Sequence, residues 1–127
     1  MLKIEPSHYK SKVNSAIILE KEGHTRDAHE RYKQVIEEFP NEARVYHNLG
    51  INMRRNGMLE GAMDYYKTSL DMEPDNALFQ YNLGVLHNFK KEYPKAIDIL
   101  EKSINNNPDN IYAHLALGDA YEQMKNF

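Results

Sequence analysis

The sequence repeats itself every 34 residues. Residues of five types recur with this period and in one phase: Pro40, Pro74 and Pro108; Gly50, Gly84 and Gly118; Leu49, Leu83 and Leu117; Ala28, Ala62 and Ala96; and Asn14, Asn48 and Asn82. A repeat of this length is one supersecondary unit that cannot bury its apolar face alone, so neighbouring units must stack on one another. This periodicity constrains the fold more than any other feature of the chain.

Within a repeat, the apolar and small residues have the spacing of a helix. They follow i, i+3, i+4, i+7 in residues 43–57 and i, i+4, i+7, i+8 in residues 60–72: Tyr46, Leu49, Gly50 and Met53, then Ala62, Tyr66, Ser69 and Leu70. Asn56-Gly57 separates the two segments, because glycine readily ends a helix in a left-handed conformation. Pro74 stops the second segment, and Asp75 and Asn76 offer capping side chains to the next helix. Each repeat is predicted to be a helix, a tight turn and an antiparallel helix.

These landmarks resemble the tetratricopeptide repeat (TPR) family. Residues 43–76 carry the large, small and proline positions of the family motif: Tyr46, Leu49, Gly50, Met53, Ala62, Tyr66 and Pro74. The resemblance implies an all-α fold, a right-handed α-solenoid of antiparallel helix hairpins with about seven helices. The alternative is a plain antiparallel bundle with accidental periodicity. Small residues in the motif would let the two helices of a hairpin approach closely.

The period divides the chain into an N-terminal leader and successive repeats. The expected parts are the leader 1–8, three repeats at 9–42, 43–76 and 77–110, and the first helix of a fourth repeat at 111–127. Lys12 and Ser15 occupy apolar positions of the first repeat, and Gln80 and His87 do so in the third. The last segment keeps an apolar face, formed by Ile111, Leu115, Leu117, Tyr121, Met124 and Phe127. We expect a chain cut from a longer array, with a natural capping half-repeat as the alternative.

Several classes of chemistry are not expected. The chain has no cysteine, so it has neither a disulfide framework nor a thiol nucleophile. The histidines lack metal-ligand spacing, and His24 and His29 lie roughly 140° apart around a helix. The glycines are isolated, so no phosphate-binding loop is predicted. We expect no cofactor, no metal and no active site.

Charge and hydropathy limit the partners and the location. The net charge is only −3, which gives no global attraction to nucleic acid or to anionic lipid. No apolar run is long enough to span a bilayer, and the start of the chain lacks the apolar segment of a signal peptide. We expect a cytoplasmic protein whose partner is a protein or peptide.

In the TPR family, six positions on the first helix of each repeat face a concave groove. The peptide-binding residues that the resemblance implies are Asn14, Arg44, His47, Asn48, Ile51, Arg54, Arg55, Leu78, Tyr81, Asn82, Val85, Phe89, Tyr112 and Leu115. The same positions also hold Lys10, Val13, Ile17, Glu20, Lys21, Asn88, Ala116, Asp119, Glu122 and Gln123. The expected wall is basic at its start, apolar and aromatic further on, and acidic at its end.

Two features of this wall suggest a mode of binding. Asn14, Asn48 and Asn82 form a row similar to the asparagine ladder of O-linked N-acetylglucosamine transferase, which grips the main chain of protein substrates. The alternative is that these side chains are simply solvated. The aromatic stripe of Tyr81, Phe89 and Tyr112 would anchor ligand side chains; the alternative is partial burial between hairpins.

The basic part of the wall suggests an acidic or phosphorylated segment as ligand. Arg44, Arg54 and Arg55, with His47, form one compact patch, and guanidinium groups pair well with such anions. Pairing with surface carboxylates such as Glu20 is the alternative.

Some TPR proteins clamp the C-terminal carboxylate of heat-shock chaperones with a defined set of lysine, asparagine and arginine residues. Two registers place the repeats of this chain on that set: Val13, Ile17, Asn48, Leu78 and Asn82 in one, and His47, Ile51, Asn82, Tyr112 and Ala116 in the other. Only the asparagine matches in either register, so this kind of chaperone binding is not expected.

The sequence therefore predicts a non-catalytic protein-interaction module that holds an extended or helical peptide in its groove. Two alternatives stay open. One is a self-assembling scaffold that stacks through residues 111–127, and the other is the targeting arm of a larger enzyme.

Overall fold

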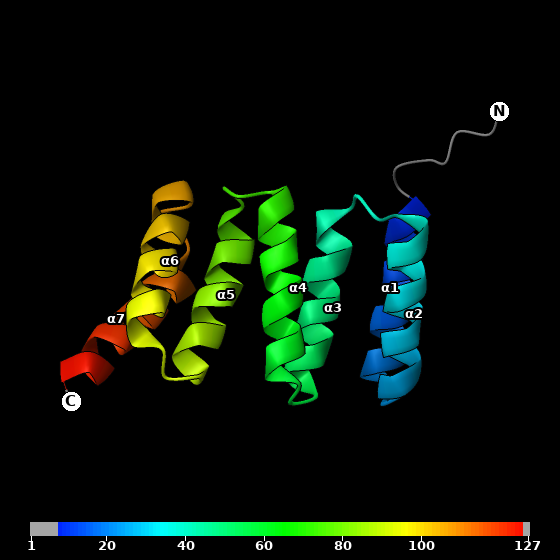
Figure 1. Ribbon diagram of the computed structural model, residues 1–127, viewed down its shortest axis with the longest axis horizontal. Helices are drawn as coiled ribbons and strands as arrows, with labels where there is room; N and C mark the ends of the chain where they lie inside the picture. Colours follow the sequence, from blue (N-terminus) through cyan, green and yellow to red (C-terminus); the bar gives the residue numbers. More distant parts are fainter. Residues whose placement is uncertain (1–7, 126–127) are drawn as a thin grey trace. The chain divides into compact units, whose positions relative to one another are not determined.

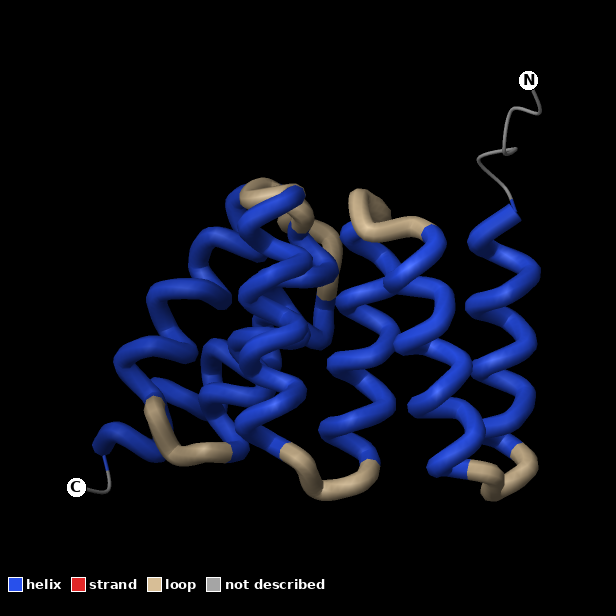
Figure 2. The backbone as a smooth tube through the Cα atoms, turned by 45° about the vertical axis from the view of Figure 1, so that its right-hand side comes forward, coloured by secondary structure: helices blue, strands red, loops and turns tan. Residues whose placement is uncertain are grey.

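A computed structural model describes residues 8–125 of the protein, and these residues form helices joined by short loops (Figures 1 and 2). Seven α-helices follow one another in this part of the chain: α1 (His8–Lys21), α2 (Thr25–Glu38), α3 (Ala43–Arg55), α4 (Leu59–Met72), α5 (Ala77–Phe89), α6 (Tyr93–Asn106) and α7 (Ile111–Lys125). The predicted leader, apart from His8, and Phe127 lie outside the described residues. No described helix is both long enough and apolar enough to cross a membrane.

The chain divides into two compact units, residues 1–68 and 69–127. In the first unit, α1 packs on α2, α2 packs on α3, and α1 also contacts α3. In the second unit, α5, α6 and α7 make the same set of contacts. In each set of three, the first helix thus touches both the second and the third, which is how a helical solenoid is built. The predicted all-α solenoid class is confirmed.

Three turns between paired helices contain a residue with positive φ. Gly23 has a φ of 87° and Gly57 a φ of 79°, a conformation that costs glycine little. The predicted helix end at Asn56-Gly57 is therefore confirmed. Lys91 occupies the equivalent place between α5 and α6, with a φ of 64°. A residue with a Cβ atom is strained in this region.

Small residues set the distance between the helices of a pair. Ala28, Ala62 and Ala96 are fully buried. A Cβ atom built on Gly84 would lie 2.5 Å from Cγ of Leu100, closer than real side chains approach. The predicted role of the small positions is confirmed at these residues.

In the first hairpin, polar contacts take the place of apolar packing. Lys12 of α1 forms an ion pair with Glu38 of α2. The Ser15 hydroxyl accepts a hydrogen bond of 2.8 Å from Nη1 of Arg31, which also lies on α2. The two residues that depart from the family pattern therefore connect α1 to α2.

The polar residues at apolar positions of the third repeat are buried and paired. Gln80 donates to the carbonyl oxygen of Pro74 at 2.9 Å and accepts from Asn106 at 3.0 Å. The Nδ1 atom of buried His87 lies 3.2 Å from the Glu92 carboxylate, and this contact lowers the pKa of Glu92. Their hydrogen bonds offset the cost of taking polar groups out of water.

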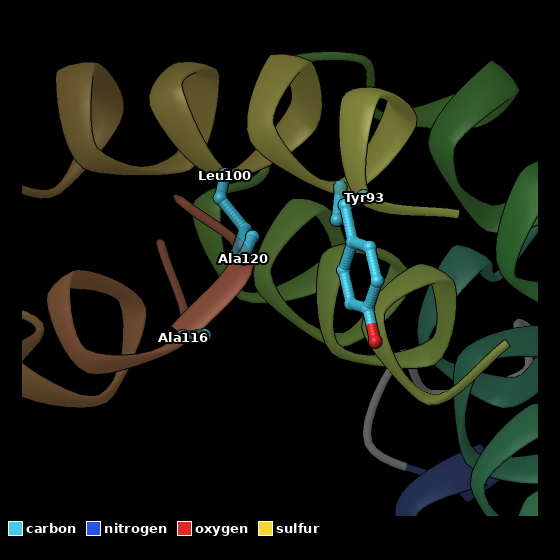
Figure 3. Close-up of a cluster of buried hydrophobic side chains, with 5 residues drawn as sticks. Tyr93, Leu100, Ala116 and Ala120 are labelled. Carbon is cyan, nitrogen blue, oxygen red and sulfur yellow. The ribbon is translucent and has the colours of Figure 1, made fainter. Parts of the chain in front are cut away.

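The core of the second unit forms where α6 meets α7 (Figure 3). It consists of Tyr93, Ala96 and Leu100 from α6 with Ala116 and Ala120 from α7. Alanines on the buried face of α7 let it lie close to α6. Leu117 is partly buried against this core, whereas five other large apolar residues of the helix are exposed: Ile111, Tyr112, Leu115, Tyr121 and Met124.

Candidate peptide-binding site

The second unit contains a groove of about 740 Å³ between α5, α6 and α7. Its lining residues are Tyr81, Val85, Asn88, Phe89, Tyr93, Tyr112, Leu115, Ala116, Asp119 and Gln123. All of them except Tyr93 stand at positions that the sequence predicted to face a groove. The structure therefore brings together five of the predicted binding residues, three on α5 and two on α7.

The periodicity of the two helices explains why these side chains share a face. On α5, Tyr81, Val85 and Phe89 are four residues apart, and such residues lie above one another on a helix. On α7, Leu115 and Asp119 have the same spacing. Two stripes on neighbouring helices form the walls of the groove.

Asn88 connects these walls. Its Nδ2 atom donates a hydrogen bond of 3.0 Å to the backbone carbonyl oxygen of Ala116. The bond runs from the side chain of α5 to the main chain of α7, so it fixes α7 against α5 beside the groove. The two stripes that line the groove are thus held in place by a hydrogen bond between their helices.

The groove exposes large apolar side chains to solvent. Phe89 is 72% exposed, Tyr112 69% and Leu115 60%, while Tyr81 and Val85 are half-buried. Gathered apolar surface of this kind marks interaction sites. Burial between hairpins, the alternative considered for the aromatic stripe, does not describe Phe89 or Tyr112.

Tyr93 is the lining residue that the repeat pattern did not predict. It begins α6, whereas the family pattern placed groove residues only on the first helix of each repeat. The helical spacing gives no signal for it, because α5 ends at Phe89 and the turn at Lys91 interrupts the periodicity.

A smaller hollow of about 380 Å³ lies on the first unit. It is lined by Tyr9, Lys10, Val13, Asn14, Ile17, Arg44 and Asn48. Two asparagines of the predicted row therefore share one hollow with two cationic side chains. Asn82 belongs to the second unit and does not line the groove there.

The structure divides the predicted basic patch. Arg55 forms an ion pair with Glu20, which is the alternative that the sequence left open. Arg54 lies near buried Tyr66; burial raises the pKa of Tyr66, and Arg54 partly offsets this effect. Arg44 is exposed.

His47, predicted to face the groove, is instead buried. It is 2% exposed, and its ring stacks on the ring of Tyr66 with the centroids 5.2 Å apart. Burial, reinforced by Arg44 and Arg54, lowers the pKa of His47 to about 4. The imidazole is neutral at physiological pH, so it adds no charge to the surface.

Two further predicted residues lie outside both hollows. Leu78 is exposed in the first turn of α5, and Ile51 is half-buried on α3. Among residues 8–125, no group of three or more histidine, aspartate or glutamate side chains is arranged to hold a metal ion.

Models of the tetratricopeptide repeat match residues 14–72 and 53–118. The chain belongs to the tetratricopeptide repeat family. No curated protein matches this TPR chain significantly over its sequence.

Solved structures have the same fold. The first TPR of Spaghetti (RPAP3) bound to the HSP90 peptide SRMEEVD superposes with a TM-score of 0.87 at 12% identity, over 98% of this chain and 99% of that one. A structure of MamA gives 0.80 at 26% identity, over 92% of this chain and 64% of MamA. A TPR protein from Parabacteroides merdae gives 0.85 at 20% identity, over 96% of this chain and 48% of its own. The Spaghetti and Parabacteroides merdae structures, at 12% and 20% identity, show that the fold is shared and nothing more.

Proposed function

We propose that this TPR chain is a non-catalytic interaction module that holds a peptide or protein segment in the groove of its second unit. The observation that carries the proposal is the exposure of Phe89, Tyr112 and Leu115 around one hollow of about 740 Å³. Ligand pockets commonly have volumes in this range, and exposed aromatic side chains commonly anchor a partner.

The groove is also built to lose little entropy when it binds. Its side chains stand on helices, and the Asn88–Ala116 hydrogen bond braces two of them. A preorganised surface gives up less conformational freedom on association than a flexible loop does. This favours a role in recognition. The HSP90 peptide on the Spaghetti repeats is a precedent for peptide binding on this fold.

The chemistry of the groove argues against an acidic peptide of the HSP90 type. None of the described residues that line it is a lysine or an arginine, and Asp119 contributes a negative charge. The residue set by which TPR proteins clamp a chaperone carboxylate is also absent, apart from the asparagine.

The hollow on the first unit is a second proposed contact, with a different preference. Lys10 and Arg44 supply positive charge there, and the amides of Asn14 and Asn48 can both donate and accept hydrogen bonds. An acidic side chain or an extended main chain fits this chemistry. The hypothesis that the asparagine row grips the main chain of a ligand is therefore kept for Asn14 and Asn48.

Selection from a displayed peptide library tests the proposed groove. We expect Tyr112→Ser to weaken the best selected peptide roughly tenfold or more, as loss of an aromatic anchor does. Ile111→Ser is the matched control, because Ile111 is also 69% exposed on α7 but does not line the groove. Its affinity should stay within about twofold of the wild type. Equal losses in the two variants would show that the groove is not the binding surface.

Self-association through α7 is a second candidate function, favoured by a separate apolar hollow of about 450 Å³. Pro94 and Ile97 of α6 line it together with Tyr121 and Met124 of α7. We expect light scattering over a concentration series to show a dimer that Met124→Asp disrupts. A wild-type chain that stays monomeric at every concentration would exclude this candidate.

A further inference from the structure

We infer that the groove of the second unit selects a segment carrying an arginine or lysine side chain next to an apolar one. This rests on the proposed function and names the chemistry of the partner at the same site. Three features of the second unit support it: the charge in the groove, the charge of the unit around it, and the accessible aromatic rings.

Asp119 is the charged residue among the described side chains that line the groove. It is exposed, and within residues 8–125 its carboxylate has no ion-pair partner. Two lysines of the second unit, Lys90 and Lys95, instead lie 3.6 Å from carboxylate oxygens of Glu92. Asp119 is thus open to a cation from a ligand.

The charge of the surrounding unit has the same sign. Residues 69–127 contain nine aspartates and glutamates but only five lysines and no arginine, which gives a net charge of −4. Residues 1–68 carry ten acidic and eleven basic residues, a net charge of +1. The modest charge of the whole chain conceals this division. The field of the second unit attracts cationic segments and repels acidic ones.

The aromatic rings provide the second half of the recognition. A guanidinium or ammonium group is attracted to the face of an aromatic ring, and a guanidinium also stacks on it. Phe89 and Tyr112 expose about seven-tenths of their surface in the groove, and Tyr81 is half-buried beside them. The aliphatic part or the guanidinium plane of a cationic side chain can therefore lie on one of these rings while its charge approaches Asp119.

The apolar part of the groove requires a neighbouring apolar side chain. Val85 and Leu115 line the groove and have no charge to offer. A polar cationic segment would leave them exposed to water, at a cost in buried apolar area. The preferred segment alternates apolar and cationic side chains.

Four fluorescein-labelled peptides test this inference by fluorescence anisotropy: GLRFRLG, GLQFQLG, GLEFELG and GSRSRSG. We expect GLRFRLG to bind roughly tenfold more tightly than GLEFELG, with GLQFQLG between them and GSRSRSG weaker than GLRFRLG. The affinity for GLRFRLG should fall as salt is raised, because the attraction is partly electrostatic.

The variant Asp119→Asn removes the charge with little change in shape. It should reduce the preference for GLRFRLG over GLQFQLG to within about twofold, because GLRFRLG loses the attraction between its arginines and the carboxylate. Asp109→Asn is the control, because it removes the same charge from an exposed turn outside the groove. This control should keep the wild-type preference.

The outcomes separate this inference from the proposed function. If GLEFELG or GLQFQLG binds as tightly as GLRFRLG, the cationic preference is wrong, but the groove still binds peptides. If none of the four binds and a library-selected peptide does, the preference is again wrong and the proposed function stands. If the selected peptide also fails to bind, the proposed function itself falls.

Discussion

Gly50 lies directly against the ring of Tyr66, which packs on it from α4. A Cβ atom at Gly50 would be 2.6 Å from Cδ1 of Tyr66 and 2.7 Å from Cε1. Gly84 has the same relation to Leu100, but within residues 8–125 no atom from outside the local helix backbone lies within 4 Å of the Cβ position of Gly118. Glycines in one phase of the repeat therefore have different neighbours, and the same substitution should have different effects.

Gly50→Ala should destabilise the fold by roughly 1–3 kcal/mol, because the fully buried ring of Tyr66 must shift to admit a methyl group. Gly118→Ala should be neutral or stabilising by up to about 1 kcal/mol, since alanine favours the helix and meets no neighbour. Urea denaturation followed by circular dichroism measures both. Equal destabilisation by the two substitutions would contradict the packing described for Gly118.

Lys91→Gly should stabilise the protein by roughly 0.5–1 kcal/mol. Lys91 has a φ of 64°, a strained conformation for a side chain and an easy one for glycine. Its side chain is exposed, so its removal costs little. Thermal and urea denaturation would reveal the gain. Lys90→Gly serves as the comparison, because Lys90 has a φ of −82° and glycine relieves no strain there. A loss of stability in Lys91→Gly would refute the prediction.

Glu20 accepts hydrogen bonds from Asn52 and Arg55 and thereby connects α1 to α3. Its side chain is only 12% exposed, and Asn52 is fully buried. Glu20→Ala should cost roughly 1–3 kcal/mol, because it leaves the buried amide of Asn52 without this partner. Arg55→Ala should cost less than about 1 kcal/mol, since Arg55 is 58% exposed and its ion pair is screened by water. Similar losses from both variants, measured by urea denaturation, would mean that the ion pair and not the amide contact dominates.

The stability of the protein should fall as the pH decreases from neutral. The pKa of His47 drops from 6.5 to about 4 on folding, so between these values the unfolded chain binds a proton that the folded chain does not. By linkage, this lowers the free energy of unfolding by about 2 kcal/mol between roughly pH 7 and pH 5. His47→Phe keeps a ring beside Tyr66 but cannot titrate. Urea denaturation of both proteins should therefore show a smaller pH dependence in the variant, and parallel curves would contradict the burial of a neutral His47.

Helices and turns were predictable because they depend on neighbours in the sequence. The spacing of Leu49, Met53 and their equivalents indicates a helix whatever the helix packs against. Gly57 ends a helix because glycine readily adopts a positive φ. The exposed Phe89 and Tyr112 were also found from the repeat, because the pattern fixes which face of a helix a residue occupies. Position on a face, however, does not determine burial. His47 shares the predicted face but lies under Tyr66.

The sequence by itself determined the repeat, the hairpins, their small contact positions and the face from which a groove would be built. All of these follow from a period of 34 residues acting through local helix geometry. Only the tertiary structure decided that Arg55 is paired with Glu20, that His47 is neutral and buried, and that Tyr93 completes a groove whose charge comes from Asp119. Burial and pairing depend on which side chains of other helices arrive at the same place. One-dimensional periodicity contains no information about those distances.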